Sequence, residues 1–89
     1  MQEYIIVDIR FVTCTIGEAL LEINNQLNQA GLPNVTENDL IDEYPTEHEE
    51  DWFDDYMFVF RKIFTGNYED IVHRLETYVD DFEINPEDE

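Results

Sequence analysis

Apolar side chains alternate along the N-terminal stretch from Tyr4 to Val12. A period of two is that of a β-strand, because successive side chains of a strand point to opposite faces of the sheet. The positions between the main apolar residues are also partly apolar, which favours a strand in the middle of a sheet. The main set at period two is Ile5, Val7, Ile9 and Phe11.

The next stretch has the 3.6-residue period of an amphipathic helix, predicted over residues 16–30. Thr15 and Glu18 have the spacing of a capping box, in which a threonine hydroxyl and a glutamate carboxylate satisfy free amides of the first turn. Gly31 and Pro33 supply the left-handed cap and the stop that end such a helix.

The middle of the chain is harder to assign. Residues 35–44 are compatible with a strand that ends before Pro45, or with a short helix capped by Thr36 that has Asp39 as its third residue. The strand is the interpretation that we favour. Residues 46–51 are predicted as a polar loop, and the aromatic run within 52–64 as a strand with both faces partly covered.

Asn67 is predicted to cap a second helix, with Glu69 and Asp70 at its positive end. A short strand is expected at residues 82–84, followed by a frayed acidic tail at 85–89. The buried stripe of the second helix is predicted to be Ile71, Val72, Leu75, Tyr78 and Val79.

The predicted order is therefore β-α-β-β-α-β in a single α+β domain over residues 1–84. This pattern is most simply a ferredoxin-like sandwich, with two helices on one face of a four-stranded antiparallel sheet. Substitutions in the core should affect folding alone; the expected core residues are Ile9, Leu20, Ile23, Leu27, Phe58, Phe60, Ile71 and Leu75.

The net charge of the chain says more about its partners than any sequence motif does. The 89 residues carry a formal charge of −19, and no lysine or arginine occurs between Arg10 and Arg61. Such a surface repels nucleic acid and anionic membranes and attracts basic proteins. A single cysteine, Cys14, excludes an internal disulfide, and no signal segment or long apolar run is present. We therefore expect a cytoplasmic protein with a basic partner and no membrane contact.

The densest acidity lies in residues 37–55, where ten of the 19 residues are Asp or Glu. Most acidic runs are solvated faces or disordered tails, but this run contains aromatic residues that disordered acidic segments usually lack. Aromatic side chains at strand spacing are mostly core; Tyr44, Trp52 and Phe53, beside the densest charge, are candidates for an interface anchor.

Catalysis and metal binding are poorly supported by the same residues. The chain has two histidines, no nucleophile motif and no glycine-rich phosphate loop. Residues 39–51 lack the glycine that a calcium loop needs, and a site made from His48, Glu49 and Asp51 lacks the usual ligand spacing. We expect no enzymatic activity, no cofactor and no dedicated metal site.

The spacing of the acids suggests what they imitate. Duplex DNA carries one negative charge per about 1.7 Å of axis, and proteins bind it with grooves of Lys and Arg. Carboxylates two residues apart on a strand lie about 6.6 Å apart, and those one helical turn apart about 5.4 Å. The pair Glu37 and Asp39 has the strand interval; the pairs with the helical interval are Glu18 with Glu22, and Glu76 with Asp80.

On these grounds the chain resembles the small acidic DNA-mimic proteins by which phages block host nucleases, including anti-restriction and anti-CRISPR inhibitors. It is most similar to the anti-restriction nuclease proteins of T-even-like phages. The resemblance is carried by length, acidity and the tail from Asp70-Ile-Val72 through Tyr78-Val-Asp-Asp-Phe-Glu-Ile84. It implies an inhibitor in the host cytoplasm that occupies the DNA-binding groove of a nuclease and binds no nucleic acid itself.

Two other classes remain open: an immunity protein or antitoxin that blocks one basic nuclease toxin, and an acidic adaptor for an arginine-rich segment. A homodimer is compatible with mimicry, because a two-fold pair extends the negative surface. The expected partner-binding residues are Glu37, Asp39, Asp42, Glu43, Tyr44, Glu47, Glu49, Glu50, Asp51, Trp52, Asp54 and Asp55, with Glu76, Asp80 and Asp81 as a second patch.

Overall fold

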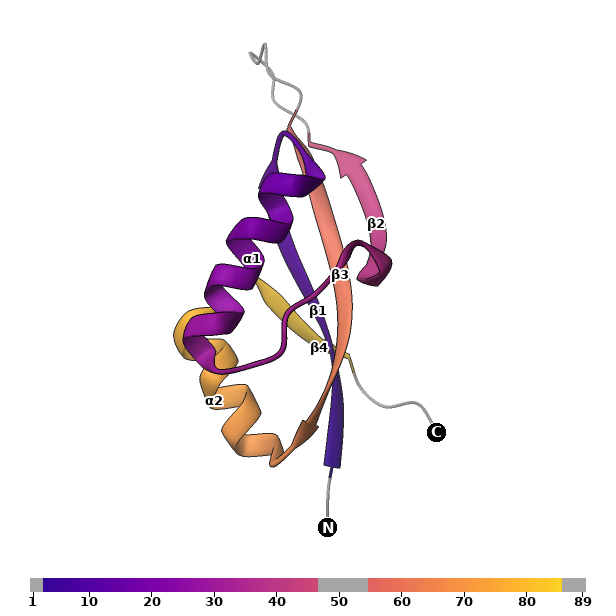
Figure 1. Cartoon of the computed structure of the whole chain (residues 1–89). Coiled ribbons are helices and arrows are strands. Elements are labelled where there is room, and N and C mark those ends of the chain that lie inside the picture. Colours follow the sequence, from indigo (N-terminus) through magenta and orange to yellow (C-terminus); the bar gives the residue numbers. More distant parts are fainter. Residues whose placement is uncertain (1–2, 47–54, 86–89) are drawn as a thin grey trace.

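The N-terminal strand occupies an inner position of a four-stranded sheet, as its two-sided apolar pattern predicts. The protein is represented by a computed structural model, which describes residues 3–46 and 55–85. Figure 1 shows the elements of this part of the chain. In chain order they are β1 (Glu3–Thr13), α1 (Ile16–Ala30), the 3-10 turn η1 (Glu37–Asp39), β2 (Leu40–Pro45), β3 (Tyr56–Gly66), α2 (Tyr68–Tyr78) and β4 (Phe82–Asn85).

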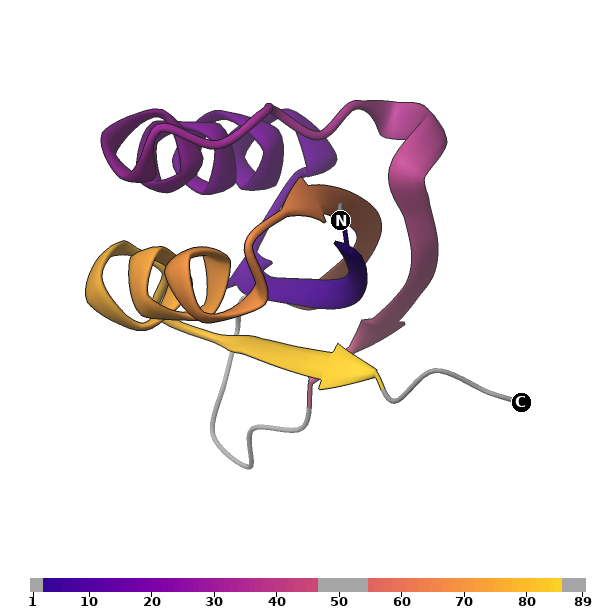
Figure 2. The same cartoon turned by 90° about the horizontal axis from the view of Figure 1, so that it is seen from below.

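The strands are ordered β2-β3-β1-β4, and every neighbouring pair is antiparallel. Strands β1 and β2 are consequently parallel across β3, and each of α1 and α2 crosses over between two parallel strands. Both helices pack on one face of the sheet; the other face, called the helix-free face below, has no helix over it among the described residues (Figures 1 and 2). The predicted α+β, ferredoxin-like arrangement is confirmed.

The core lies between the helices and the inner face of the sheet. The most deeply buried side chains include Ile9, Phe60 and Phe64 from the strands and Ile23 and Leu75 from the helices. All eight predicted core residues contribute; seven are buried, while Leu20 is half-buried at the edge of the cluster. No helix of the described segments is long and apolar enough to cross a membrane.

The prediction that Tyr78 belongs to the buried stripe of α2 is wrong. Tyr78 is 42% exposed, whereas Ile71, Leu75 and Val79 are buried. Those three residues define the side of the helix that faces the sheet, and Tyr78, the last residue of α2, lies at the flank of that side.

Helix α1 begins and ends as predicted, with one change in the capping box. The backbone amide of Glu18 donates to Thr15 Oγ1 at 3.2 Å. The carboxylate of Glu18 does not return to Thr15; it accepts a 2.7 Å hydrogen bond from the hydroxyl of Thr13 at the end of β1. Gly31 ends the helix with φ 75°, a conformation that favours glycine, and an added Cβ would lie 2.7 Å from Arg74 Nη1.

The favoured strand over residues 35–44 is wrong in its first half. Val35 is buried and fixed to α1 by two hydrogen bonds with the side chain of Asn24, so the chain there follows the helix. Thr36 then precedes η1, as in the helical alternative, and the strand begins only at Leu40. Strand β3 begins at Tyr56; the part of its predicted range at 52–54, with Trp52 and Phe53, lies outside the described residues.

Candidate functional site

The acidic residues predicted to bind a partner are carried by the edge strand β2 and the turn η1 before it. We call this surface the β2 edge and define it as Glu37, Asp39, Asp42, Glu43 and Tyr44. The two elements that carry these five residues lie on one margin of the sheet (Figure 1), and four of the five are exposed. Asp39 is the half-buried member, and it is also the one acid of the four with a lysine partner among the described residues.

Asp39 has a structural role. Its carboxylate accepts a 2.9 Å hydrogen bond from the amide of Thr36, and its own amide donates to the carbonyl of Thr36 at 2.9 Å. Lys62 Nζ lies 3.9 Å from the same carboxylate. Glu37 and Asp39 are therefore in a 3-10 turn, so the strand spacing predicted for this pair is wrong.

Strand β2 presents its acids to two sides. Asp42 is paired with Val59 and faces the helix-free side of the sheet, whereas Glu43 is paired with Phe58 and faces the helix side. A register shift between Leu40 and Asp42 bulges this edge, and the Asp42 carboxylate accepts the amide of Glu43 at 2.9 Å. Neither acid has a lysine or arginine partner within the described residues, and Tyr44 beside them is 43% exposed.

Asp55 lies at the end of the sheet, where β2 and β3 are held together. Its carbonyl accepts hydrogen bonds from the backbone amide and the hydroxyl of Thr46, at 3.0 and 3.2 Å. Its carboxylate accepts from Cys14 Sγ at 3.4 Å. The remaining acidic candidates of the run, and Trp52, lie outside the described residues; they are Glu47, Glu49, Glu50, Asp51 and Asp54.

The second predicted patch is carried by α2 and by the segment that joins α2 to β4, the edge strand opposite β2. Glu76 is on α2, but α2 ends at Tyr78, so the helical interval predicted between Glu76 and Asp80 is wrong. The amide of Asp80 donates to Gln26 Oε1 of α1 at 3.2 Å. Asp81 accepts two hydrogen bonds from the guanidinium of Arg10, at 2.9 and 3.2 Å. Only Glu76 and Asp80 remain as acids without a basic partner in this described patch.

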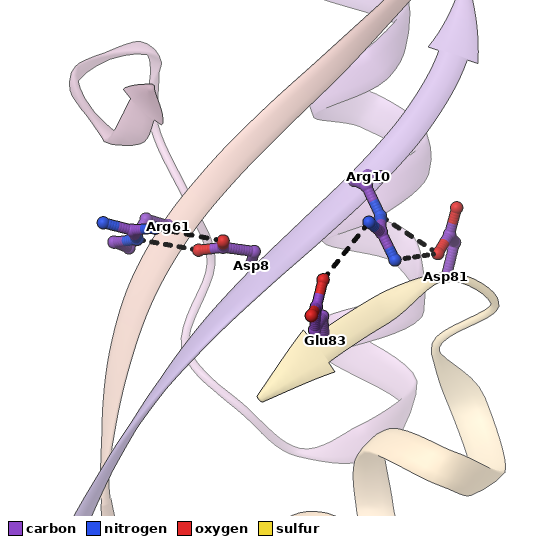
Figure 3. Close-up of polar contacts among 5 residues, drawn as sticks. All are labelled: Asp8, Arg10, Arg61, Asp81 and Glu83. Carbon is purple, nitrogen blue, oxygen red and sulfur yellow. Dashed lines mark hydrogen bonds and ion pairs between the residues drawn. The ribbon is translucent and has the colours of Figure 1, made fainter. Parts of the chain in front are cut away.

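Every lysine and arginine of the chain is paired with a carboxylate. On the helix-free face Arg61 contacts Asp8 across the two inner strands, and Arg10 of β1 contacts Asp81 and Glu83 at the β4 edge (Figure 3). Lys62 and Arg74 contact Asp39 and Asp70. The β2 edge consequently keeps Glu37, Asp42 and Glu43 without a fixed counter-charge among the described residues.

The pair between Asp8 and Arg61 shifts the pKa of both side chains. Arg61 Nε and Nη2 donate to the two oxygens of Asp8 at 2.8 and 3.1 Å. These hydrogen bonds lower the pKa of Asp8, although its partial burial acts in the opposite direction, and the Asn85 amide nearby adds to the lowering. Asn85 Nδ2 is buried without a hydrogen bond of good geometry, so we attribute its influence to the nearby dipole. The same pairing raises the pKa of Arg61.

The sequence interpretation missed this paired cluster. A signal was available, because Asp8 and Arg10 interrupt the apolar pattern of β1 on alternate positions, which places both on the same side of the strand. No group of three His, Cys, Asp or Glu side chains within the described ranges is arranged to hold a metal ion.

No family model matches the chain, and comparisons with curated proteins and with solved structures find no significant match either.

Proposed function

We propose that this protein is a non-enzymatic inhibitor that imitates DNA and occupies the nucleic-acid-binding groove of a nuclease or another DNA-binding protein. One observation carries the proposal: all four lysine and arginine side chains are in internal ion pairs, while Glu37, Asp42 and Glu43 of the β2 edge have no counter-charge in the described structure. A negative field of this kind attracts a groove lined with Lys and Arg. A phage-encoded protein would act in this way on a defence nuclease in the host cytoplasm.

The β2 edge supplies the charge without a regular repeat. Asp42 and Glu43 point to opposite sides of the strand, and Glu37 precedes them in η1. The helical interval expected between Glu18 and Glu22 is kept, since both lie in α1 and are exposed. The target would therefore be bound by a cluster of negative charge. Affinity should fall steeply with salt, because binding releases the counterions held at both surfaces and added salt opposes this release.

An immunity protein against a single basic nuclease toxin is the second candidate. The exposed ring of Tyr44, between the acids of β2 and the apolar side chain of Met57 on β3, favours it. Exposed aromatic residues beside charges are typical anchors of tight interfaces, where a few residues supply most of the binding energy. In that case Tyr44→Ala should reduce affinity by at least roughly tenfold, whereas a mimic should tolerate it.

The test is a capture experiment from host lysate with the purified protein as bait, repeated with excess duplex DNA. We expect a DNA-binding protein to be captured and to be displaced by DNA. Capture of a partner that ignores DNA would overturn mimicry, and capture of a single toxin would favour the immunity protein.

Paired neutral substitutions then locate the surface. Asp42→Asn with Glu43→Gln removes two charges from the β2 edge, and Glu69→Gln with Asp70→Asn removes two from exposed positions of α2 outside the candidate set. Affinity of the captured target should fall by roughly tenfold or more for the first pair and much less for the second. Equal losses would show that total charge decides binding, and no loss from either would show that the β2 edge is merely solvated.

A further inference from the structure

The helix-free face of the sheet carries exposed and half-buried apolar side chains at both of its ends. Strand register places Tyr4, Ile6 and Ile63 at one end of this face and Val12 and Met57 at the other, and the charged residues of the face lie between these two ends. Ile63 is 56% exposed and Val12 41%, and Tyr44 of β2, which is 43% exposed, is paired with Met57 at the Val12 end. Exposed apolar groups on one face of a small domain often mark a contact surface.

The same face is almost neutral in a strongly acidic protein. It holds Arg10 and Arg61 together with four acids, so its formal charge is −2; the four acids are Asp8, Asp42, Asp81 and Glu83. Since the whole chain carries −19, the other residues carry −17. The two arginines lie on the inner strands β1 and β3 and are paired with three of the four carboxylates (Figure 3), whereas Asp42, which has no basic partner among the described residues, lies on the edge strand β2.

We infer that this helix-free face is the contact surface between two copies of the chain. Two molecules of charge −19 repel each other in most orientations, and a face with apolar side chains and paired charges is the described surface on which that repulsion is smallest. A basic partner is a poorer occupant. It would be drawn to the acidic β2 edge, and on this face it would meet Arg10 and Arg61.

The size of the face fits a dimer of moderate affinity. Strands of 11, 11, 6 and 4 residues, at about 3.3 Å per residue and about 4.8 Å between strands, cover roughly 500 Å² in projection. Standard stable interfaces bury about 800 Å² per partner. Side-chain relief adds to the projected area, so we expect an equilibrium between monomer and dimer that protein concentration shifts.

This inference goes beyond the proposed function and does not depend on it. Face-to-face packing of two sheets leaves the helices outside, so both copies keep Glu43 and the η1 acids accessible at the margins. Salt should also change the affinity of target binding and the affinity of the dimer in opposite directions. Screening weakens attraction to a basic target but weakens repulsion between two acidic copies, so salt should strengthen the dimer.

The experiment is sedimentation equilibrium of the full chain over a range of protein concentrations, at about 0.05 M and about 0.5 M NaCl. We expect a monomer–dimer equilibrium whose dissociation constant falls by roughly tenfold or more at the higher salt. A monomer under all conditions, or a dimer that salt weakens, would overturn the inference.

A matched pair of variants assigns the surface. Val12→Thr with Ile63→Thr removes apolar contact on the helix-free face and keeps residues that favour strands, whereas Leu21→Gln removes a 62% exposed leucine from α1 and keeps a good helix former. The dissociation constant should rise by at least roughly tenfold for the first variant, because a two-fold contact loses each side chain twice, and should stay unchanged for Leu21→Gln. A thermal melt confirms that both variants fold. If the dimer persists in the first variant, or is lost in the second, its contact surface lies elsewhere.

Discussion

Asp8 and Asp42 lie on the same face of the same sheet, separated by one strand, but the structure uses them differently. Asp8 is at the centre, has a side chain only 15% exposed, and receives two hydrogen bonds from Arg61. Asp42 is on the edge strand, is exposed and has no basic partner in the described chain. The difference shows that, in a protein with 23 acids, the position of four basic residues decides which carboxylates are structural.

The helix-free face and the β2 edge both depend on the core beneath them. Phe60→Ala should remove about 3–5 kcal/mol of unfolding free energy, since this fully buried ring lies on β3 between the two regions. Urea denaturation measures the loss, and the more conservative Phe60→Leu should cost clearly less. If Phe60→Ala left the unfolding free energy unchanged, the packing described for β3 would be wrong.

Neutralising Asp8 and Asp42 in turn tests whether the two carboxylates contribute differently to stability. Asp8→Asn should lower the unfolding free energy by about 1 kcal/mol, because it removes one partner of a charged pair that is partly shielded from solvent. Asp42→Asn should change it by only a few tenths of a kcal/mol, or raise it slightly by reducing repulsion. Equal effects in urea denaturation would contradict the distinction between the two positions.

The pH dependence of stability should differ between these positions in a defined direction. The folded pKa of Asp8 lies below its unfolded value, so the pair stabilises the protein above the unfolded pKa of about 3.9 and loses this effect as pH falls through the folded pKa. The gap in unfolding free energy between the wild type and Asp8→Asn should therefore be full near neutral pH and close below about pH 4. A gap that widens in acid would show the opposite shift.

Salt should stabilise the monomer, in contrast to its usual effect on proteins held by surface ion pairs. The few ion pairs are outweighed by repulsion among the excess acids, which added ions screen. We expect the melting temperature of a dilute sample to rise by a few degrees, about 1 kcal/mol or less, between low and moderate NaCl. A fall would show that the internal pairs dominate.

The smallest effect concerns the link between β1 and α1. Glu18→Gln weakens the hydrogen bond that Thr13 donates to the Glu18 carboxylate, and it should cost a few tenths of a kcal/mol. Thr15→Ala removes the side-chain cap of the same helix and should cost about 1 kcal/mol. Thermal melts compare the two, and a larger loss from Glu18→Gln would mean that the contact to Thr13 outweighs the cap.

Much of this fold could be predicted from local patterns. The strand at residues 4–12, the helix from Ile16 to Ala30 and the cap at Asn67 depend on periodicity and on short-range hydrogen bonds, which neighbouring residues determine. The order of those elements, in turn, favoured the ferredoxin-like sheet. The first half of residues 35–44 was predicted wrongly because its course depends on Asn24, a residue of a different element.

The sequence by itself determined that the protein is small, strongly acidic and of the α+β class, because composition and periodicity are properties of the chain alone. Only the tertiary structure decided which acids are neutralised, since Arg10 meets Asp81, and Arg61 meets Asp8, from positions far apart in the chain. It also placed the acids of β2 and Asp81, which directly precedes β4, at opposite edges of the sheet. Charge pairing is a matter of distance in space, and antiparallel register sets that distance.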